Sequence, residues 1–385
     1  MLFNDFLTLF TFLKLNIIFL YAFTSLKDIS ILGCLTMRIV DLRSDTVTKP
    51  SPEMWEVVKS WDDSKLGDDV MREDPTVNEL EMKVAKKLRK EAALFVSSGT
   101  QGNLISLLAQ TTPGDEIMVE EESHIFGHEV GSAARIGGLM IRTYASERGF
   151  PSLKKLQTMI RDSNDIHEPP SKLLCAENTH NYHGGTIIKP EELKEMRDFA
   201  LKNNLKFHLD GARIFNASVA SNLPITDFTK HADSVMFCLS KGLSCPIGSM
   251  VVGPKDFIDR ARKFRKMLGG GMRQAGIIAS FGLVALEDKW INRLNEDHNN
   301  AKRLADGVLS LNLSISVQKP ETNILMVYFP DNAPIKKIIL SLQSEGVLAY
   351  DINQKIRFVT HFGIDEDDID FSIEKIGNVL KKILN

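Results

Sequence analysis

From about residue 90 onward the sequence alternates short runs of apolar and β-branched residues with longer amphipathic stretches. This rhythm predicts a mostly parallel sheet with helices on both faces, because parallel strands need long crossover connections. The last two strands are joined by too few residues for a crossover helix, so one of them is expected to run antiparallel. The seven expected strands are Ala93–Ser97, Glu116–Glu120, Met140–Tyr144, Lys172–Ala176, Lys206–Leu209, Val235–Leu239 and Ser249–Val252. The clearest helices between them are Gln101–Gln110, Leu153–Arg161 and Pro190–Asn203.

An earlier helix is expected to start at Asp74. The Asp74 side chain can cap the helix, and Pro75 fits its first turn. One face then carries an apolar stripe made of Val77, Leu80, Val84 and Leu88.

A chain of 385 residues is long enough for two packed units. We expect a large domain over residues 37–290, which includes an N-terminal arm, and a small α/β domain over residues 291–385. Helix Lys255–Asn292 is expected to join them, since no low-complexity linker occurs. The small domain is expected to contain strands near Ile324–Phe329, Val347–Tyr350 and Arg357–Thr360 and a closing helix from Asp367 to Leu384.

Residues 1–36 are unusually apolar. Phe6–Phe23 is rich in aliphatic and aromatic residues, but Lys14 and Asn16 interrupt it and no basic cluster precedes it. Such a segment fits neither a signal peptide nor a continuous membrane span. We therefore expect a non-native or dispensable extension and a cytoplasmic protein, with organellar or membrane targeting as the alternative.

Composition excludes several classes of function. A formal net charge of −3 gives no reason to expect a nucleic acid partner. The basic stretch Arg260–Lys266 is short and is typical of a solvated helix face. The four cysteines show neither metal-ligand spacing nor disulfide-rich density, so a reducing compartment and no metal are expected.

Lys241 lies just past the expected strand Val235–Leu239, after Ser240, and is flanked by apolar and small residues. A lysine is usually a solvated surface charge, whereas a partly desolvated amine can form an imine. Asp210 ends another apolar run. Open α/β sheets bind ligands at the carboxyl ends of their strands, so both side chains are expected at one edge. For Asp210 alone, a structural turn at Gly211 is an equally good explanation.

The stretch Ser97–Asn103 places small residues where a strand leads into a helix. Gly99 and Gly102 allow close approach, and the free N–H groups of a helix start bind phosphate. Taken alone, ordinary helix capping is the commoner explanation. A phosphate cradle, a carboxylate and an amine in this chain order are the contacts that hold pyridoxal 5'-phosphate, so this cofactor is predicted.

From Met37 onward the chain resembles the low-specificity L-threonine aldolase family, which belongs to the aspartate-aminotransferase-like (fold type I) pyridoxal phosphate enzymes. The resemblance implies an α/β fold with a mostly parallel seven-stranded sheet and a small C-terminal α/β domain. The matching stretches are Asp41–Thr48, Gly67–Val70 with Glu73–Thr76, Ser98–Asn103, Glu177–His180, His208–Arg213, Ser240–Leu243, Lys266–Met267, Gly269–Gln274 and Arg357–His361.

The resemblance also implies roles for residues that bind the cofactor. Lys241 would form the internal aldimine, and Asp210 would pair with the pyridine nitrogen. Gly99 and Thr100 would hold the phosphate, and His124 would stack on the ring. Two further residues, Arg273 and Lys266, would lie near the phosphate or reach it across a dimer interface.

The implied substrate site contains Arg213, which would also contact the phenolic oxygen of the cofactor. With Ser44 and Arg357 it would bind the substrate carboxylate, and this grip disfavours decarboxylation. His180 would lie near the substrate hydroxyl. The base that removes the hydroxyl proton stays open among His124, His180 and an ordered water.

The implied reaction is retro-aldol cleavage of L-threonine, L-allo-threonine and related β-hydroxy amino acids, which gives glycine and acetaldehyde from threonine. The alternatives are another fold type I lyase that performs β-elimination, or a cofactor-binding homologue without activity. A homodimer or homotetramer with shared active sites is expected, with a small amino acid as substrate. The chain departs from the family pattern at Met71 and Arg72, where a tyrosine and a glycine are common, which puts the pocket for the substrate side chain, or the dimer contact around it, in question. His128 also stands where an aromatic residue is common.

Overall fold

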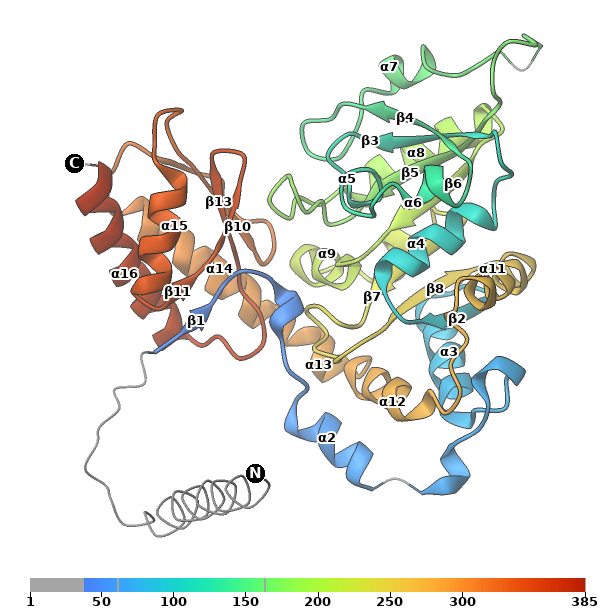
Figure 1. The fold of residues 1–385 in the computed structure, drawn as a ribbon, viewed down its shortest axis with the longest axis horizontal. Coiled ribbons are helices and arrows are strands. Elements are labelled where there is room, and N and C mark those ends of the chain that lie inside the picture. The colour runs from blue at the N-terminus through green and yellow to red at the C-terminus, as the bar shows by residue number, and fades with distance from the viewer. Residues whose placement is uncertain (1–37, 61, 163, 385) are drawn as a thin grey trace, which may run out of the picture. The chain divides into compact units, whose positions relative to one another are not determined.

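The computed structural model describes residues 38–60, 62–162 and 164–384 (Figure 1). The chain from Ile39 onward forms one compact unit. Our expectations for residues 1–36 lie outside the described part. Among the described helices, none is both long enough and apolar enough to cross a membrane.

A seven-stranded sheet forms the centre of this unit, in the order β2-β8-β7-β6-β5-β3-β4. β8 runs antiparallel to β2 and β7, and the remaining neighbours are parallel, as the spacing of the last two strands predicts. All seven predicted strands are confirmed, with ends shifted by one residue at most. They are β2 (Ala92–Val96), β3 (Glu116–Glu120), β4 (Met140–Tyr144), β5 (Ser171–Glu177), β6 (Lys206–Asp210), β7 (Ser234–Cys238) and β8 (Ser249–Gly253).

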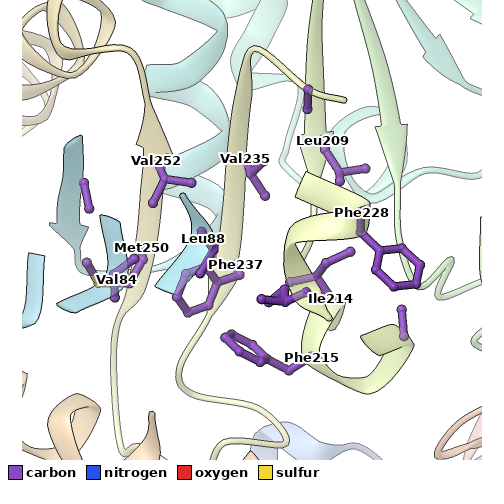
Figure 2. Close-up of a cluster of buried hydrophobic side chains, with 14 of the residues drawn as sticks. Val84, Leu88, Leu209, Ile214, Phe215, Phe228, Val235, Phe237, Met250 and Val252 are labelled. Atoms are coloured by element: carbon purple, nitrogen blue, oxygen red, sulfur yellow. The ribbon is translucent and has the colours of Figure 1, made fainter. Parts of the chain in front are cut away.

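Helices cover both faces of the sheet. On one face, Val235 and Phe237 of β7 pack with Phe215 and Phe228 (Figure 2). On the other face, Met236 of β7 packs in a separate apolar cluster beneath α4 and α11. Both faces of the sheet are therefore buried beneath apolar side chains, as expected of a parallel sheet. The helices of this region are α2 (Pro52–Lys59), α3 (Pro75–Leu88), α4 (Gly99–Leu108), α5 (His124–Gly127), α6 (Ser132–Arg135), α7 (Leu153–Gln157), α8 (Pro190–Lys202), α9 (Ile214–Ser221), α10 (Ile225–Thr229), α11 (Lys255–Met267), α12 (Gly276–Ala285) and α13 (Asp288–Asn292).

The start of α3 confirms the predicted cap. One Asp74 carboxylate oxygen accepts hydrogen bonds from the backbone N–H groups of Thr76 and Val77, at 3.1 and 3.0 Å. The other oxygen accepts the N–H of Gly276 at 2.9 Å, which ties α3 to the start of α12. All four residues of the predicted apolar stripe are buried.

The prediction of one helix over Lys255–Asn292 is wrong. The chain leaves α11 at Met267 and turns through Gly269, whose φ of +78° suits glycine, before α12 begins. The prediction that the basic stretch Arg260–Lys266 is a solvated helix face is also wrong at Arg265, whose exposed fraction is 1 %. Its guanidinium donates to the carbonyl of Phe95 at 2.7 Å and pairs with Asp69 at 2.9 Å.

The C-terminal part contains a four-stranded antiparallel sheet in the order β12-β13-β10-β9, with its own apolar cluster. Residues Val347–Tyr350 do not form one strand, because β11 pairs with β1 near the N-terminus whereas β12 pairs with β13. The boundary between domains at residue 290 stays a prediction. The elements are β1 (Val40–Asp41), α14 (Leu294–Leu309), β9 (Ser316–Val317), β10 (Ile324–Tyr328), α15 (Ile335–Ser344), β11 (Val347–Leu348), β12 (Tyr350–Ile352), β13 (Lys355–Val359) and α16 (Glu366–Leu384).

Candidate active site

The carboxyl ends of β5, β6 and β7 open onto a cavity of about 300 Å³. Glu177 and Asp210 are register partners at the ends of β5 and β6, and Lys241 follows β7. This edge of an open α/β sheet is where ligands bind. Six residues predicted for the site line the cavity, namely Ser44, His124, Asp210, Arg213, Lys241 and Arg357.

Asp210 is a buried carboxylate without a cationic partner at ion-pair distance among the described residues. It accepts hydrogen bonds from the Asn103 amide at 2.8 Å and from the backbone N–H of Ala212 at 3.0 Å. Burial raises the pKa of Asp210, and the nearby Glu177 raises it further. A cationic group at this carboxylate would compensate for the burial, so the position suits a protonated pyridine nitrogen.

Lys241 is half-buried, and its backbone is fixed at both sides of the turn. Its carbonyl oxygen accepts hydrogen bonds from the Thr48 hydroxyl at 3.1 Å and from the backbone N–H of Ser244 at 2.8 Å. The backbone of Lys241 is therefore held by the N-terminal arm as well as by the turn after β7.

Arg213 is already paired. Two of its guanidinium nitrogens donate to Asp45 at 2.7 and 2.8 Å, and the third lies 3.3 Å from the side-chain oxygen of Asn181. Burial would raise the pKa of Asp45, but Arg213 holds it well below its usual value. One edge of Arg213 is thus used by Asp45, and the remaining nitrogen, Nη1, donates to Asn181 with one of its two N–H groups.

Arg357 is 8 % exposed and has no carboxylate partner within the described chain. It donates to the Asn181 side-chain oxygen at 2.8 Å and to the carbonyl of Arg43 at 3.2 Å, and its Nε is buried without a partner. Burial lowers the pKa of Arg357, and the charge of Arg213 lowers it further. A buried cation with only neutral partners fits a site for an anionic group.

His124 lies in the cavity wall and is held from one side. Its Nδ1 lies 3.0 Å from Glu129, and its backbone N–H donates to Glu177 at 2.6 Å. Within the described residues, Nε2 has no hydrogen-bond partner. Burial would lower the pKa of His124, but the hydrogen bond with Glu129 and the charge of Asp210 raise it above its ordinary value.

His180 does not line this cavity. It is fully buried, with Nε2 3.0 Å from Glu120 and Nδ1 accepting the backbone N–H of His183 at 3.4 Å. Both ring nitrogens are therefore engaged. Burial would raise the pKa of Glu120, but hydrogen bonds with His180 and His183 lower it to about 2.

The predicted phosphate cradle lies at the start of α4, where Ser98 caps the helix by accepting the N–H of Gln101 at 3.2 Å. Gly99 and Thr100 begin this helix but do not line the cavity. A Cβ on Gly99 would lie 2.9 Å from the sulfur of Cys238, and one on Gly102 would lie 2.7 Å from Met236. These glycines therefore let α4 approach β7 closely.

Lys266 and Arg273 lie away from the Lys241 cavity in the single chain. Arg273 is exposed and pairs with Asp68 at 2.6 Å, and Lys266 lines a separate cavity beside α11. Met71 is exposed, and Arg72 pairs with Asp259 at 2.6 Å. A role for Lys266 or Arg273 across a dimer interface stays a prediction.

Several residues in and around the site were not predicted from the sequence as functional residues. Asn103 and Asn181 lie inside or next to matching motifs, so the motifs were a usable signal for them. Asp45 also lies inside a matching motif, Asp41–Thr48, whereas the contacts of Glu129 depend on the tertiary fold and leave no local pattern. The cavity wall also contains Glu177, Tyr182 and Tyr350.

The sheet order and the Lys241–Asp210 pair at its edge define a pyridoxal phosphate enzyme of the aspartate-aminotransferase-like class. A model of the β-eliminating lyase family matches residues 41–332. The chain is 41% identical to probable low-specificity L-threonine aldolase 2 of Arabidopsis thaliana, over 87% of this chain and 96% of the relative. It is 40% identical to the low specificity L-threonine aldolase of Escherichia coli K12, over 86% and 96% of the two chains. The chain belongs to the low-specificity L-threonine aldolases within the β-eliminating lyase family.

Solved structures agree with this fold. The threonine aldolase of Leishmania major superposes with a TM-score of 0.77 at 19% identity, covering 88% of this chain and 99% of that chain. A serine palmitoyltransferase of Sphingomonas wittichii superposes with a TM-score of 0.72 at 15% identity, covering 90% and 88%. At these identities the likeness concerns the fold.

Proposed function

We propose that this protein uses pyridoxal 5'-phosphate to cleave L-threonine and L-allo-threonine into glycine and acetaldehyde. Arg357 carries the proposal: it is a buried guanidinium with neutral partners, in the same cavity as Lys241. An amino acid brings a carboxylate for Arg357 and an amine that can exchange with the lysine. The names of the relatives support the choice of substrate.

The residues of the cavity fit the cofactor. Lys241 would attach it, Asp210 would hold the ring nitrogen in its cationic form, and His124 would cover the ring. Gly99 and Thr100 would meet the phosphate at the start of α4. When bound, pyridoxal phosphate supplies an electron sink for the pair released when the bond at Cα breaks.

Arg357 and the remaining nitrogen of Arg213 would bind the substrate carboxylate, with Ser44 at the same wall. Asn181 accepts hydrogen bonds from both arginines, so it orients them together. Held in this way, the carboxylate is kept in the product instead of being lost as carbon dioxide. The bonds of Cα to Cβ and to hydrogen remain, and removal of the β-hydroxyl proton selects the Cα–Cβ bond.

His124 is the better candidate for the base that takes the hydroxyl proton. Its Nε2 is open toward the cavity, and Glu129 stabilises the protonated ring through Nδ1. His180 has both nitrogens engaged and instead holds the turn that carries Asn181. The proton moves from the β-hydroxyl to His124, acetaldehyde leaves, and Cα gains a proton to give glycine.

We further propose a cytoplasmic homodimer or homotetramer in which Lys266 and Arg273 of one subunit complete the phosphate site of its neighbour. Both residues are cationic and lie outside the Lys241 cavity of their own chain. We also propose a domain boundary at residue 290. The four-stranded sheet that follows it supports this boundary, because it has its own apolar cluster.

Replacing the lysine tests the proposal. Lys241→Ala should abolish glycine release from L-threonine and remove the pyridoxyl label that borohydride reduction leaves on the protein. The variant Lys202→Ala, which changes an exposed residue of α8, is the matched control and should keep both. A labelled peptide other than the one containing Lys241 would contradict the assignment. Ammonia and 2-oxobutanoate as products would instead favour β-elimination.

A further inference from the structure

Asn103 of α4 does not line the Lys241 cavity, but its side chain joins two buried carboxylates behind the cavity wall. Its amide nitrogen donates to Asp210 and to Glu129, each at 2.8 Å. Asp210 is the proposed partner of the ring nitrogen, and Glu129 lies 3.0 Å from Nδ1 of His124. One amide group therefore contacts the residue that supports the cofactor and the residue that supports the base.

A chain of hydrogen bonds fixes the orientation of this amide. Nε2 of Gln110 donates to the Ser234 hydroxyl oxygen at 2.8 Å, which leaves the hydroxyl proton for Nδ1 of His208, also at 2.8 Å. Burial lowers the pKa of His208 to about 3, so the ring is neutral and carries its single proton on Nε2. This nitrogen lies 3.2 Å from the side-chain oxygen of Asn103. With its oxygen engaged by His208, Asn103 presents both N–H groups to the carboxylates.

The two carboxylates are close enough to compete for a proton. One oxygen of Glu129 lies within 4.8 Å of one oxygen of Asp210, and both side chains are buried. Burial raises the pKa of Glu129, hydrogen bonds with His124 and Asn103 lower it, and the charge of Asp210 raises it again. The second carboxylate oxygen of Glu129 is buried without a partner among the described residues. Glu129 therefore depends on Asn103 and His124 to stay ionised.

Asp210 depends on the same amide. Burial and the charge of Glu177 raise its pKa, whereas the charges of His124 and Lys241 and the hydrogen bond from Asn103 lower it. The titratable groups that face His124 and the two carboxylates are Glu177, Lys241 and His128. Within the described chain, none of these three donates a hydrogen bond to either carboxylate, so the amide of Asn103 is the group that serves both.

We propose that Asn103 is a positioning residue whose two N–H groups hold Asp210 and Glu129 side by side with both carboxylates ionised. Asp210 can then pair with the cationic ring nitrogen, while Glu129 stabilises the protonated ring of His124. Without the amide, the two carboxylates would share one proton, and either the ring nitrogen or His124 would lose its anionic partner. The part that concerns His124 rests on the proposed function, whereas the part that concerns Asp210 requires only that the protein binds pyridoxal phosphate.

The variant Asn103→Leu, which keeps a side chain of similar size without donors, tests this role. Calorimetric titration of pyridoxal phosphate into the cofactor-free protein should give a dissociation constant about tenfold above that of the wild type, because Asp210 loses a hydrogen bond to its charged form. The acidic limb of kcat/KM for L-threonine should move to lower pH, because a shared proton weakens the negative charge next to His124. Asn103→Ser, which keeps one donor and is the milder change for the fold, should show both effects to a smaller extent.

Ser106→Ala is the matched control. Ser106 is buried on the same helix, and its hydroxyl donates to the carbonyl of Gly102 at 2.7 Å, so this variant removes a buried hydrogen bond of α4 that involves neither carboxylate. It should keep the wild-type dissociation constant and the wild-type limb.

The positioning role would be overturned if either quantity is unchanged in both Asn103 variants, with folding checked by circular dichroism. It would also be overturned if the limb moves to higher pH, or if Ser106→Ala changes both quantities as much as Asn103→Leu does. A wild type that binds pyridoxal phosphate without cleaving L-threonine would instead reject the proposed function. The dissociation constants would then still decide whether Asn103 acts on the cofactor through Asp210.

Discussion

The two arginines of the cavity, Arg213 and Arg357, differ in the partners that their guanidinium groups have. Arg213 has a carboxylate partner in Asp45, whereas the partners of Arg357 among the described residues are neutral: the Asn181 amide, a backbone carbonyl and the Tyr350 ring. Since burying an unpaired charge is costly, we propose that this uncompensated cation binds the substrate carboxylate. The family resemblance predicted that both arginines bind the substrate carboxylate, and it could not show that Asp45 pairs with two of the three guanidinium nitrogens of Arg213.

Arg357→Ala should therefore act mainly on substrate binding. Hydrogen bonds to a charged group contribute about 2 kcal/mol, so KM for L-threonine should rise roughly thirtyfold, with a smaller change in kcat. Steady-state kinetics check this, with Arg303→Ala on the surface of α14 as the control. A large fall in kcat at unchanged KM would assign Arg357 to the chemical step instead.

The pH dependence of kcat/KM should report the protonation of His124. As a base it works when neutral, so activity rises as pH passes upward through its pKa. That pKa is raised by Glu129 and Asp210, which places the acidic limb of kcat/KM above pH 6.5. Glu129→Gln removes the carboxylate next to Nδ1, so the limb should move to lower pH. A limb that does not move in this variant would exclude His124 as the titrating group.

At the scale of elements, the strands could be predicted almost residue by residue, because each is a short apolar run bounded by turn residues. The predictions failed where the outcome depends on partners far along the chain. The segment Val347–Tyr350 splits because β1 pairs with β11 while β13 pairs with β12. The sequence predicts that Arg265 is solvated. It is buried instead, because its guanidinium donates to the carbonyl of Phe95 and pairs with Asp69.

Asp74 offers a test at this scale. It caps α3 and also accepts the N–H of Gly276, so Asp74→Ala removes a cap and leaves a buried donor unpaired. The free energy of unfolding should fall by about 2 to 4 kcal/mol, measured by urea denaturation. Asp62→Ala, which removes the cap of an exposed short helix, should cost less than about 1 kcal/mol. Equal effects of the two variants would contradict the link to α12.

At the scale of the whole molecule, stability should depend on buried histidines as well as on the apolar core. Burial lowers the pKa of His208 to about 3, so the folded state keeps it neutral while the unfolded state protonates it below about pH 6.5. This contribution is present above pH 6.5 and is lost as pH falls, until the folded group also protonates near pH 3.

The variant His208→Gln isolates this contribution. Between pH 6 and pH 4, the unfolding free energy of the wild type should fall relative to the variant by about 1.4 kcal/mol per pH unit. Chemical denaturation at several pH values checks it, and any constant cost of the substitution cancels in the slope. A difference that does not change with pH would mean that His208 is charged in the folded protein.

The central claim is that the Lys241 cavity breaks the Cα–Cβ bond of a β-hydroxy amino acid. The most direct measurement is a nuclear magnetic resonance time course with uniformly ¹³C-labelled L-threonine, the full-length protein and pyridoxal phosphate. Glycine and acetaldehyde should appear in equal amounts as threonine disappears. Formation of 2-oxobutanoate with ammonia, and no glycine, would contradict it.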